Sequence, residues 1–144
     1  SELTAMVDIV RELSVAIEAA SRTPRGERAL KGHDEYYEFL VAGRAPVHFE
    51  IAGGRLKFGD GPAPRREPLR YTRLELSEGT LRAILNGDLS PVEAMERGEL
   101  LLRTRLYGGG QMIMLLRAAY DLARARRLES GSPAQRSAGS PAGG

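Results

Sequence analysis

The sequence contains no cysteine, and histidine occurs only twice in its 144 residues. The absence of cysteine excludes disulfides, cysteine metal sites and thiol catalysis, and it is typical of the reducing cytosol. No apolar run approaches the roughly 20 residues that a membrane-spanning helix needs. No secretory signal precedes the first helical pattern. We therefore expect a cytoplasmic protein without disulfides or membrane spans.

The composition is that of a globular domain, with 42% hydrophobic and 28% charged residues and a formal net charge of +2. A chain of this length has room for one hydrophobic core. Residues 129–144 are rich in Gly, Ser, Pro and Ala, and such a segment buries too little apolar surface to offset the entropy lost on ordering. We therefore predict one domain over residues 1–128 and a disordered tail over residues 129–144.

The N-terminal residues have the spacing of an amphipathic helix. Its apolar face consists of Leu3, Met6, Val7, Val10, Leu13 and Ile17. Its polar face carries Asp8, Arg11, Glu12 and Glu18. The pattern predicts a helix that packs on a core. A helix lying on a membrane surface is the alternative, although a basic polar face would favour it more than this mixed one. Residues 21–31 follow as a predicted basic loop.

From residue 34 the pattern changes to the alternation of β-strands. Three short antiparallel strands are predicted between Asp34 and Phe58, with Gly53-Gly54 as a tight hairpin turn. Two further strands are predicted at residues 71–76 and 100–106. The chain therefore has five predicted strands, and they alternate with helices only in its second half.

Two short helices are predicted between the last two strands. Ser77 is placed to cap the first helix through its hydroxyl, and Gly87 is placed to end it. Ser90-Pro91 starts the second helix with serine at the N-cap and proline at the first helical position, and Gly98 ends it. The final helix is predicted over residues 111–125, and its first turn and a half is apolar on nearly every side.

The stretch LSEGTLRAILNGDLSPVEAMERGELLLR resembles the sterol carrier protein 2 family of non-specific lipid-transfer domains. Three motifs carry the resemblance: a helix that ends near a glycine, a Leu-x-Pro-x-x-Ala element, and a Gly-x-Leu that leads into a strand. They correspond to Leu81–Gly87, Leu89–Ala94 and Gly98–Leu100. The resemblance extends over about half of the chain. It departs at Thr104 and Arg105, where the family often has glycine followed by a polar residue.

The resemblance implies an α+β fold, with a five-stranded, mostly antiparallel sheet covered on one face by helices that form an apolar tunnel for lipids. The implied lipid-binding residues are Phe49, Ile51, Leu74, Leu76, Leu81, Ile84, Leu85, Met95, Leu102, Met112, Leu115, Leu116 and Tyr120. Methionine suits such a lining because its unbranched side chain adapts to different shapes. The glycines at 108–110 are interpreted as a hinge for the last helix, with a contact to the ligand head group as the alternative.

No constellation of residues predicts catalysis. Ser77 and Ser90 are explained as helix caps, and in this interpretation the inward strand positions are all apolar or threonine. His33-Asp34-Glu35 resembles a metal-ligand cluster, but consecutive residues of an extended chain point in opposite directions. The outward residues His48 and Glu50 do not provide the aromatic surface that a nucleic-acid-binding sheet presents. We therefore expect no catalytic residue, no metal, no cofactor and no nucleic acid.

The sequence thus predicts a carrier that binds a fatty acid, acyl-coenzyme A, sterol or isoprenoid without chemistry. A non-transferring accessory module, which holds a lipid-like intermediate and docks to partner enzymes, is the alternative. An enzyme or a nucleic-acid binder is a third, less favoured class. Two basic clusters could attract an anionic membrane surface or a phosphate-bearing ligand, or could simply be solvated surface. They are Arg22, Arg25, Arg28 and Lys31, and Arg117, Arg124, Arg126 and Arg127.

Overall fold

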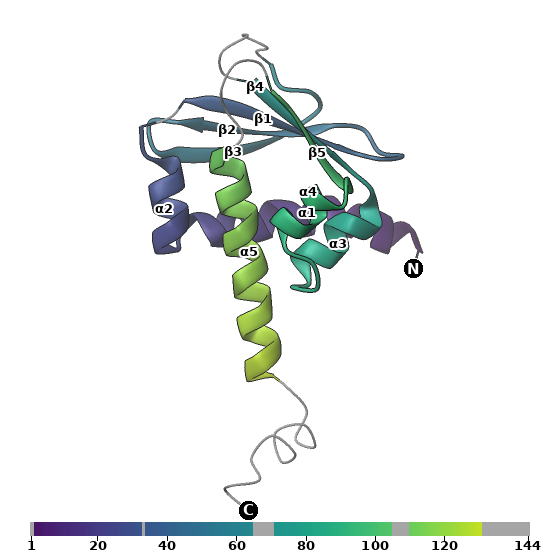
Figure 1. The fold of residues 1–144 in the computed structure, drawn as a ribbon. Helices are drawn as coiled ribbons and strands as arrows, with labels where there is room; N and C mark the ends of the chain where they lie inside the picture. The colour runs from purple at the N-terminus through teal and green to yellow at the C-terminus, as the bar shows by residue number, and fades with distance from the viewer. Residues whose placement is uncertain (1, 33, 65–70, 105–109, 131–144) are drawn as a thin grey trace, which may run out of the picture.

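The computed structural model describes residues 2–32, 34–64, 71–104 and 110–130. The helices and strands follow one another in the order α1 (Glu2–Ser21), α2 (Pro24–Leu30), β1 (Glu35–Val41), β2 (Val47–Ala52), β3 (Arg55–Asp60), β4 (Tyr71–Leu76), α3 (Glu78–Leu85), α4 (Pro91–Glu96), β5 (Leu100–Thr104) and α5 (Gly110–Glu129). All the helices lie on one side of a single sheet (Figure 1). The predicted α+β class is therefore confirmed.

The five strands are arranged in the order β3-β2-β1-β4-β5. Neighbouring strands are antiparallel except for β1 and β4, which are parallel. A parallel pair needs a crossover connection. Here the β2–β3 hairpin and the segment after it make the crossover, and that segment places Ala63 against the strand residue Glu38 on the sheet face away from the helices. The mostly antiparallel sheet that we predicted is confirmed.

The face of the sheet beneath the helices, here called the inner face, is built by strand alternation. Its largest buried side chains include Phe39 and Phe49, whose ring centroids lie 5.6 Å apart in an edge-to-face arrangement. Phe58 of the edge strand extends this contact, with its ring centroid 5.1 Å from that of Phe49. Three aromatic rings from adjacent strands thus form a row of contacts that extends from the core to the edge strand β3.

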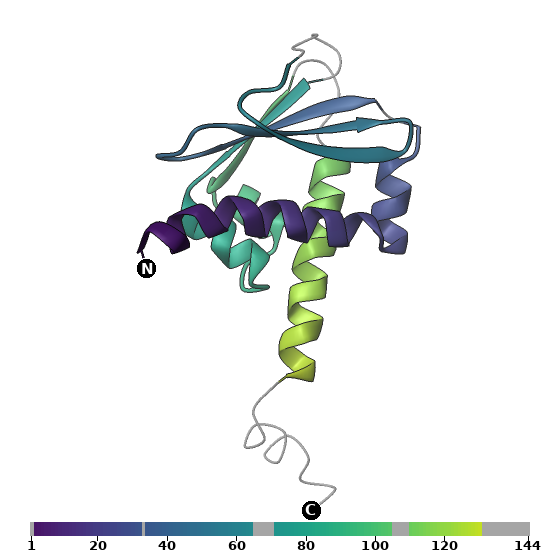
Figure 2. The ribbon, with the colours of Figure 1, turned by 180° about the vertical axis from the view of Figure 1, so that it is seen from behind.

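Helix α1 runs across the inner face, and α5 starts near the sheet and extends away from it (Figures 1 and 2). Leu13 and Ile17 of α1 are fully buried, as the amphipathic pattern predicted. Ile9, which was not part of the predicted apolar face, is also fully buried, whereas the predicted Val10 is only partly buried. The N-terminal half of α5 is also buried, but its last turns project beyond the other helices (Figure 1). This helix continues to Glu129, four residues beyond the predicted end.

The prediction of a loop over residues 21–31 was wrong, because residues 24–30 form the helix α2. The Thr23 hydroxyl accepts a hydrogen bond from the Gly26 N–H at 3.0 Å, and Pro24 occupies the first turn. Gly26 also permits a close approach to α1, since a Cβ added there would lie 1.9 Å from the Ala20 carbonyl oxygen. Thr23-Pro24 is a sequence pattern typical of a helix start, but the basic residues around it favoured the prediction of a loop.

The predicted caps of α3 and α4 are confirmed. Ser77 accepts a hydrogen bond from the Thr80 N–H, and Ser90 accepts one from the Glu93 N–H, each at 3.1 Å. Gly87 follows α3 with φ of +80°, a conformation that glycine adopts without strain. The predicted strand end at residues 105–106 and the first two glycines of the 108–110 hinge lie outside the described residues, as does residue 33 of the histidine cluster and the tail beyond residue 130.

Candidate lipid-binding site

The inner face of the sheet and the helices α1, α3 and α5 enclose a continuous layer of apolar side chains, here called the apolar layer. All thirteen residues that the sequence analysis assigned to lipid binding belong to it. Nine of them are buried: Phe49, Ile51, Leu74, Leu76, Leu81, Ile84, Met112, Leu115 and Leu116. The other four are partly exposed: Leu85, Met95, Leu102 and Tyr120. The structure thus brings the predicted residues together as one packed layer.

A cleft of about 460 Å³ opens between α1 and the edge strand β3, and we call it the β3 cleft. It is lined by Ser14, Glu18, Ser21, Arg22, Leu30, Phe49, Gly54, Arg55, Leu56 and Phe58. Its volume lies within the roughly 300–1,000 Å³ of small-molecule sites. Phe49 is a buried residue of the apolar layer and also lines the cleft, so the cleft lies directly against this layer.

Three apolar residues of the β3 cleft, Leu30, Leu56 and Phe58, were not among the predicted lipid-binding residues. Leu56 and Phe58 follow the strand alternation and pair with Ile51 and Phe49. This register puts them on the inner face at the sheet edge, where Phe58 stays 40% exposed. The alternation alone could have identified them, but Leu30 lies in the helix that the sequence analysis took for a loop.

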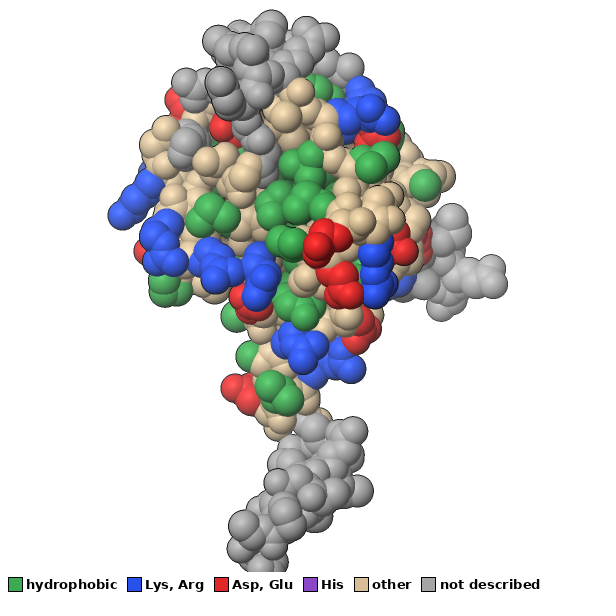
Figure 3. Space-filling view, in the orientation of Figure 1, with side chains coloured by type: hydrophobic (Ala, Val, Ile, Leu, Met, Phe, Trp, Pro, Cys, Tyr) green, Lys and Arg blue, Asp and Glu red, His purple; other side chains and the backbone are tan. Residues whose placement is uncertain are grey.

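A second accessible apolar area lies beside α5. Met95 of α4, Leu102 of β5 and Ile113 and Tyr120 of α5 are partly buried against the core. Figure 3 shows hydrophobic side chains gathered along the boundary between α5 and the α4–β5 side, with acidic side chains next to them. The apolar layer therefore comes to the surface on two sides of the molecule, at this strip and at the β3 cleft.

One end of the inner face is polar, which corrects the expectation that all inward strand positions are apolar or threonine. Glu35 faces inward and is only 8% exposed. The Tyr37 hydroxyl donates a hydrogen bond to it, and the same hydroxyl lies 3.2 Å from the side-chain oxygen of Gln111 in α5. In the neighbouring strands, Thr72 donates to Thr104 at 3.2 Å. We call these five residues the polar end; the period of two that placed Tyr37 inward also applies to Glu35.

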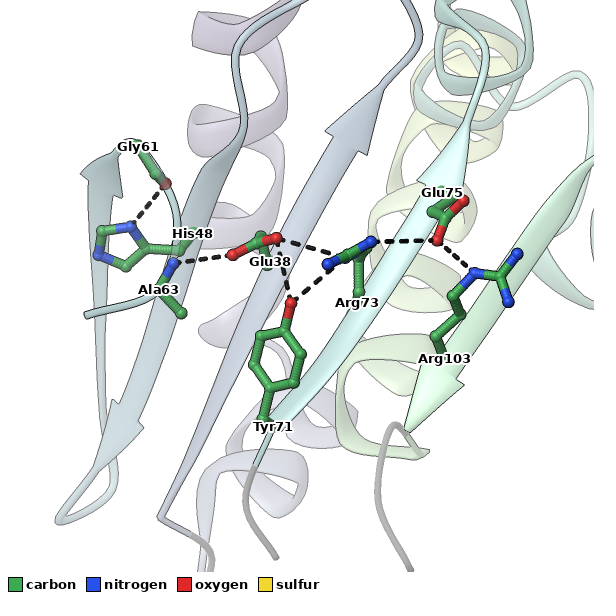
Figure 4. Close-up of polar contacts among 8 residues, drawn as sticks. All are labelled: Glu38, His48, Gly61, Ala63, Tyr71, Arg73, Glu75 and Arg103. Carbon is green, nitrogen blue, oxygen red and sulfur yellow. Dashed lines mark hydrogen bonds and ion pairs between the residues drawn. The ribbon is translucent and has the colours of Figure 1, made fainter. Parts of the chain in front are cut away.

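The outer face of the sheet carries a network of charged side chains around Glu38 (Figure 4). Glu38 accepts hydrogen bonds from the Ala63 N–H at 2.9 Å and from the Tyr71 hydroxyl at 3.1 Å. Arg73 lies 3.4 Å from Glu38 and 3.7 Å from Glu75. The hydrogen bond with Tyr71 is the main cause that raises the pKa of Arg73 above its usual value. These contacts form a network of hydrogen bonds and ion pairs on the outer face.

The two predicted basic clusters lie on neighbouring helices. Arg25 of α2 and Arg117 of α5 both bind Asp121, at 3.4 and 3.1 Å. Figure 3 shows a row of Lys and Arg side chains that extends from the α2 side onto α5. Arg124 and Arg127 instead contact the α3–α4 connection, where they donate to the carbonyl oxygens of residues 87 and 86. Arg25 and Arg117 therefore lie on a common basic surface, whereas Arg124 and Arg127 stabilise the turn between α3 and α4.

Among the described residues, no group of three His, Asp or Glu side chains could hold a metal ion. Within the same parts of the chain, no helix combines the length and the apolar character that crossing a membrane requires. The sequence matches neither a family model nor a curated protein.

Solved structures of the same fold do match. UbiJ-SCP2, a ubiquinone synthesis protein, matches with a TM-score of 0.54 and 14% identity, over 83% of this chain and 98% of that chain. A crystal structure of sterol carrier protein 2 matches with a TM-score of 0.52 and 17% identity, over 81% and 94% of the two chains. The sec-alkylsulfatase Pisa1 from Pseudomonas sp. gives a TM-score of 0.49 and 17% identity over 62% of this chain. The match covers only 13% of the length of that enzyme.

The first two of these similarities extend over almost the whole length of the matched chains, and they agree with the sequence motifs. Because the identities are this low, the two similarities show a shared fold and do not identify a ligand for this chain. The protein has the fold of sterol carrier protein 2.

Proposed function

We propose that this protein binds a lipid-type ligand in the apolar layer and carries or presents it without chemistry. The observation that supports this proposal best is the β3 cleft, because the buried Phe49 of the apolar layer forms part of its lining. The ligand classes are those of the sequence analysis, namely a fatty acid, acyl-coenzyme A, sterol or isoprenoid. The thirteen predicted residues, together with Leu30, Leu56 and Phe58, would form the lining.

The driving force would be apolar burial. Each CH₂ group moved out of water contributes about 0.8 kcal/mol, so a chain of about 16 carbons offers roughly 13 kcal/mol at most. Association costs about 4–15 kcal/mol. Because most of the lining is packed in the ligand-free chain, a ligand must also displace side chains such as Met112 and Leu115. Reversible binding, which a carrier needs, follows from this balance.

The decisive experiment is native mass spectrometry of the purified protein, followed by extraction and identification of bound molecules. It is combined with lipid titrations of Phe58→Asp, which places a charge in the β3 cleft and should weaken binding about tenfold or more. Leu101→Asp is the matched control, since Leu101 is an equally exposed strand residue on the outer face. A protein that neither contains nor takes up lipid would refute the proposal.

A non-transferring accessory module is the second candidate, and the similarity to UbiJ-SCP2 over 98% of that chain favours it. Such a module would hold its ligand for a partner enzyme rather than deliver it to a membrane. Transfer of a fluorescent lipid between donor and acceptor vesicles separates the two functions. A carrier accelerates the transfer in proportion to its concentration, whereas a module binds the lipid without accelerating it.

A further inference from the structure

The accessible apolar area beside α5 lies at the β5 edge of the molecule. We call it the α5 strip and define it by Met95, Leu102, Ile113 and Tyr120. Helix α4 packs against both α5 and β5, so side chains from these three elements form one surface. In the strand order, β5 and the strand of the β3 cleft are at opposite ends of the sheet. An apolar area with charged borders is typical of a contact with another protein.

One border of the α5 strip is basic. Arg117 of α5 lies beside Tyr120, with its guanidinium carbon 5.7 Å from the centre of the tyrosine ring. Arg117 and Arg25 of α2 share the carboxylate of Asp121, so this group of three side chains keeps a positive charge. Figure 3 shows that the row of Lys and Arg side chains continues from here towards α2. This border therefore favours acidic side chains on the surface that covers the strip.

The opposite border of the strip is acidic. Glu96 follows Met95 at the end of α4, and Glu99 directly precedes β5. Both glutamates are exposed, and neither forms an ion pair with another described residue. Glu93 in the same helix differs, because it forms an ion pair with Arg97 at 2.8 Å. Figure 3 shows acidic side chains next to the hydrophobic ones on the α4 side. This border favours basic side chains on the covering surface.

The distribution of charge around the strip is complementary to itself. In a dimer with two-fold symmetry, the same surface of both copies forms the contact. Helices α2 and α4 lie on opposite sides of α5 (Figure 1). A two-fold axis that runs along the strip would therefore bring the basic border of one copy over the acidic border of the other. The apolar side chains of the two strips would face each other at the centre.

We propose that the α5 strip is the contact surface of a symmetric homodimer, in which the basic border of each copy pairs with the acidic border of the other. The proposal goes beyond the proposed function and does not depend on lipid binding. The dimer would leave the β3 cleft of each copy open, because β3 and β5 are at opposite edges of the sheet. The apolar layer would thus remain accessible from that cleft while the strip is covered.

Sedimentation velocity of the full chain over a range of concentrations tests the dimer. The mass should rise from that of the 15.7 kDa monomer towards twice this value as the concentration increases. Glu96→Lys and Arg117→Glu should each weaken dimerisation at least about tenfold, because each substitution occurs twice and places like charges across the contact. The double variant restores opposite charges and should recover most of the lost affinity. Lys57→Glu is the matched control, since it makes the same change in charge on β3 and should leave the dimer unchanged.

The absence of cysteine allows a separate test of the geometry. Residues close to a two-fold axis contact their own copies, so Tyr120→Cys should form a disulfide between two chains under mild oxidation. Phe58→Cys is the control, because Phe58 is 40% exposed on the opposite edge strand, and it should stay monomeric under the same denaturing electrophoresis. Circular dichroism checks that each variant is folded, and if Tyr120→Cys does not fold, the charge variants decide the question.

Three results would overturn the inference: a monomer mass at every concentration, a double charge variant that dimerises no better than the single ones, or equal disulfide formation by the two cysteine variants. Equal weakening by Arg117→Glu and Lys57→Glu would assign the effect to net charge and would also overturn it. These measurements contain no lipid, so a failure of the proposed function would appear in the lipid titrations and would leave the dimer unchanged.

Discussion

Arg25 in α2 and Asp121 in α5 lie 3.4 Å apart, although 96 positions separate them in the chain. Both side chains are nearly half exposed, so this ion pair contributes little to stability. The ion pair is therefore a consequence of the position of α2 and does not determine that position. Gly26, Ala29 and Leu30 are the buried residues of α2. Their packing places the basic residues of α2 beside Arg117 of α5, and these residues form one basic surface.

We expect this basic surface to attract anionic membranes. Arg28 is exposed and has no ion-pair partner among the described residues. Arg28→Glu should therefore weaken binding to vesicles that contain phosphatidylserine by roughly tenfold at low salt, because each basic residue near such a surface contributes about 1 kcal/mol. Sedimentation of the protein with vesicles measures the effect.

The control for the vesicle experiment is Lys57→Glu, which makes the same change in charge on the exposed edge strand β3. It should reduce vesicle binding less than Arg28→Glu does. Equal losses for the two variants would show that net charge matters and that the α2–α5 surface does not.

The contact between α1 and α2 depends on the absence of a side chain at Gly26. Gly26→Ala would place a Cβ 1.9 Å from the Ala20 carbonyl oxygen, so the two helices must move apart. We expect a loss of about 1–3 kcal/mol in the free energy of unfolding. Gly79→Ala in α3 is the matched control, because the added methyl group meets only the Ser77 hydroxyl at 3.9 Å. Alanine should stabilise that helix by about 0.5–1 kcal/mol, and urea unfolding of both variants should give effects of opposite sign.

The start of α3 should make stability depend on acid pH. The hydrogen bond from Arg44 is the main cause that lowers the pKa of Glu78, and Arg82 adds to it. A carboxyl group with a lowered pKa stabilises the folded protein above the pKa of the unfolded chain, and this stabilisation disappears as the pH falls through the pKa of the folded state. Glu78→Gln should therefore lower the Tm at pH 7 and should have little effect at pH values below both pKa values.

Thermal unfolding between pH 2 and pH 7 measures this dependence. Glu93→Gln serves as the comparison, because Glu93 also forms an ion pair with an arginine, Arg97. In this pair, however, the side chains of both residues are about half exposed. Exposed pairs within one helix contribute little, so this variant should lower the Tm less at pH 7. If the Tm difference of Glu78→Gln persisted unchanged at low pH, the role of its charge would be disproved.

The parts of the fold that follow from local periodicity were predictable from the sequence. Alternation placed Phe39, Phe49 and Leu74 inward, and the serine caps fixed the starts of α3 and α4. The parallel pairing of β1 with β4 was not predictable in this way, because it depends on a crossover rather than on any repeat.

The candidate site was predicted only in its apolar part. The apolar residues repeat with the period of their helix or strand, so their grouping could be anticipated. Glu35 has the same period, but it follows His33 and Asp34, and a run of polar residues is typical of a connection rather than of an inward strand position. Leu30 lines the β3 cleft and lies in α2, a helix whose basic residues favoured the prediction of a loop. To predict a site whose residues come from elements far apart in the sequence, one must know how these elements pack as well as their sequence pattern.

Glu38 should be the most sensitive charged residue of the outer face. It is only 2% exposed, and it accepts hydrogen bonds from the crossover segment at Ala63 and from Tyr71 (Figure 4). Arg73 lies within 3.4 Å of the same carboxylate. Removal of one partner from a buried charged network typically costs about 3–5 kcal/mol, because the remaining charge and donors lose their partner. We therefore expect Glu38→Ala to destabilise the protein by about that amount, as measured by urea unfolding.

The comparison with Glu75 tests whether burial is the cause. Glu75 also contacts two arginines, Arg73 and Arg103, but its side chain is 23% exposed and water can replace part of what is lost. Glu75→Ala should therefore cost about 1 kcal/mol. Since Glu38 also holds the Ala63 N–H, Glu38→Ala should increase proteolysis in the crossover segment, whereas Glu75→Ala should not. Equal destabilisation by the two substitutions, with no change in proteolysis, would mean that the network does not fix the crossover on the outer face.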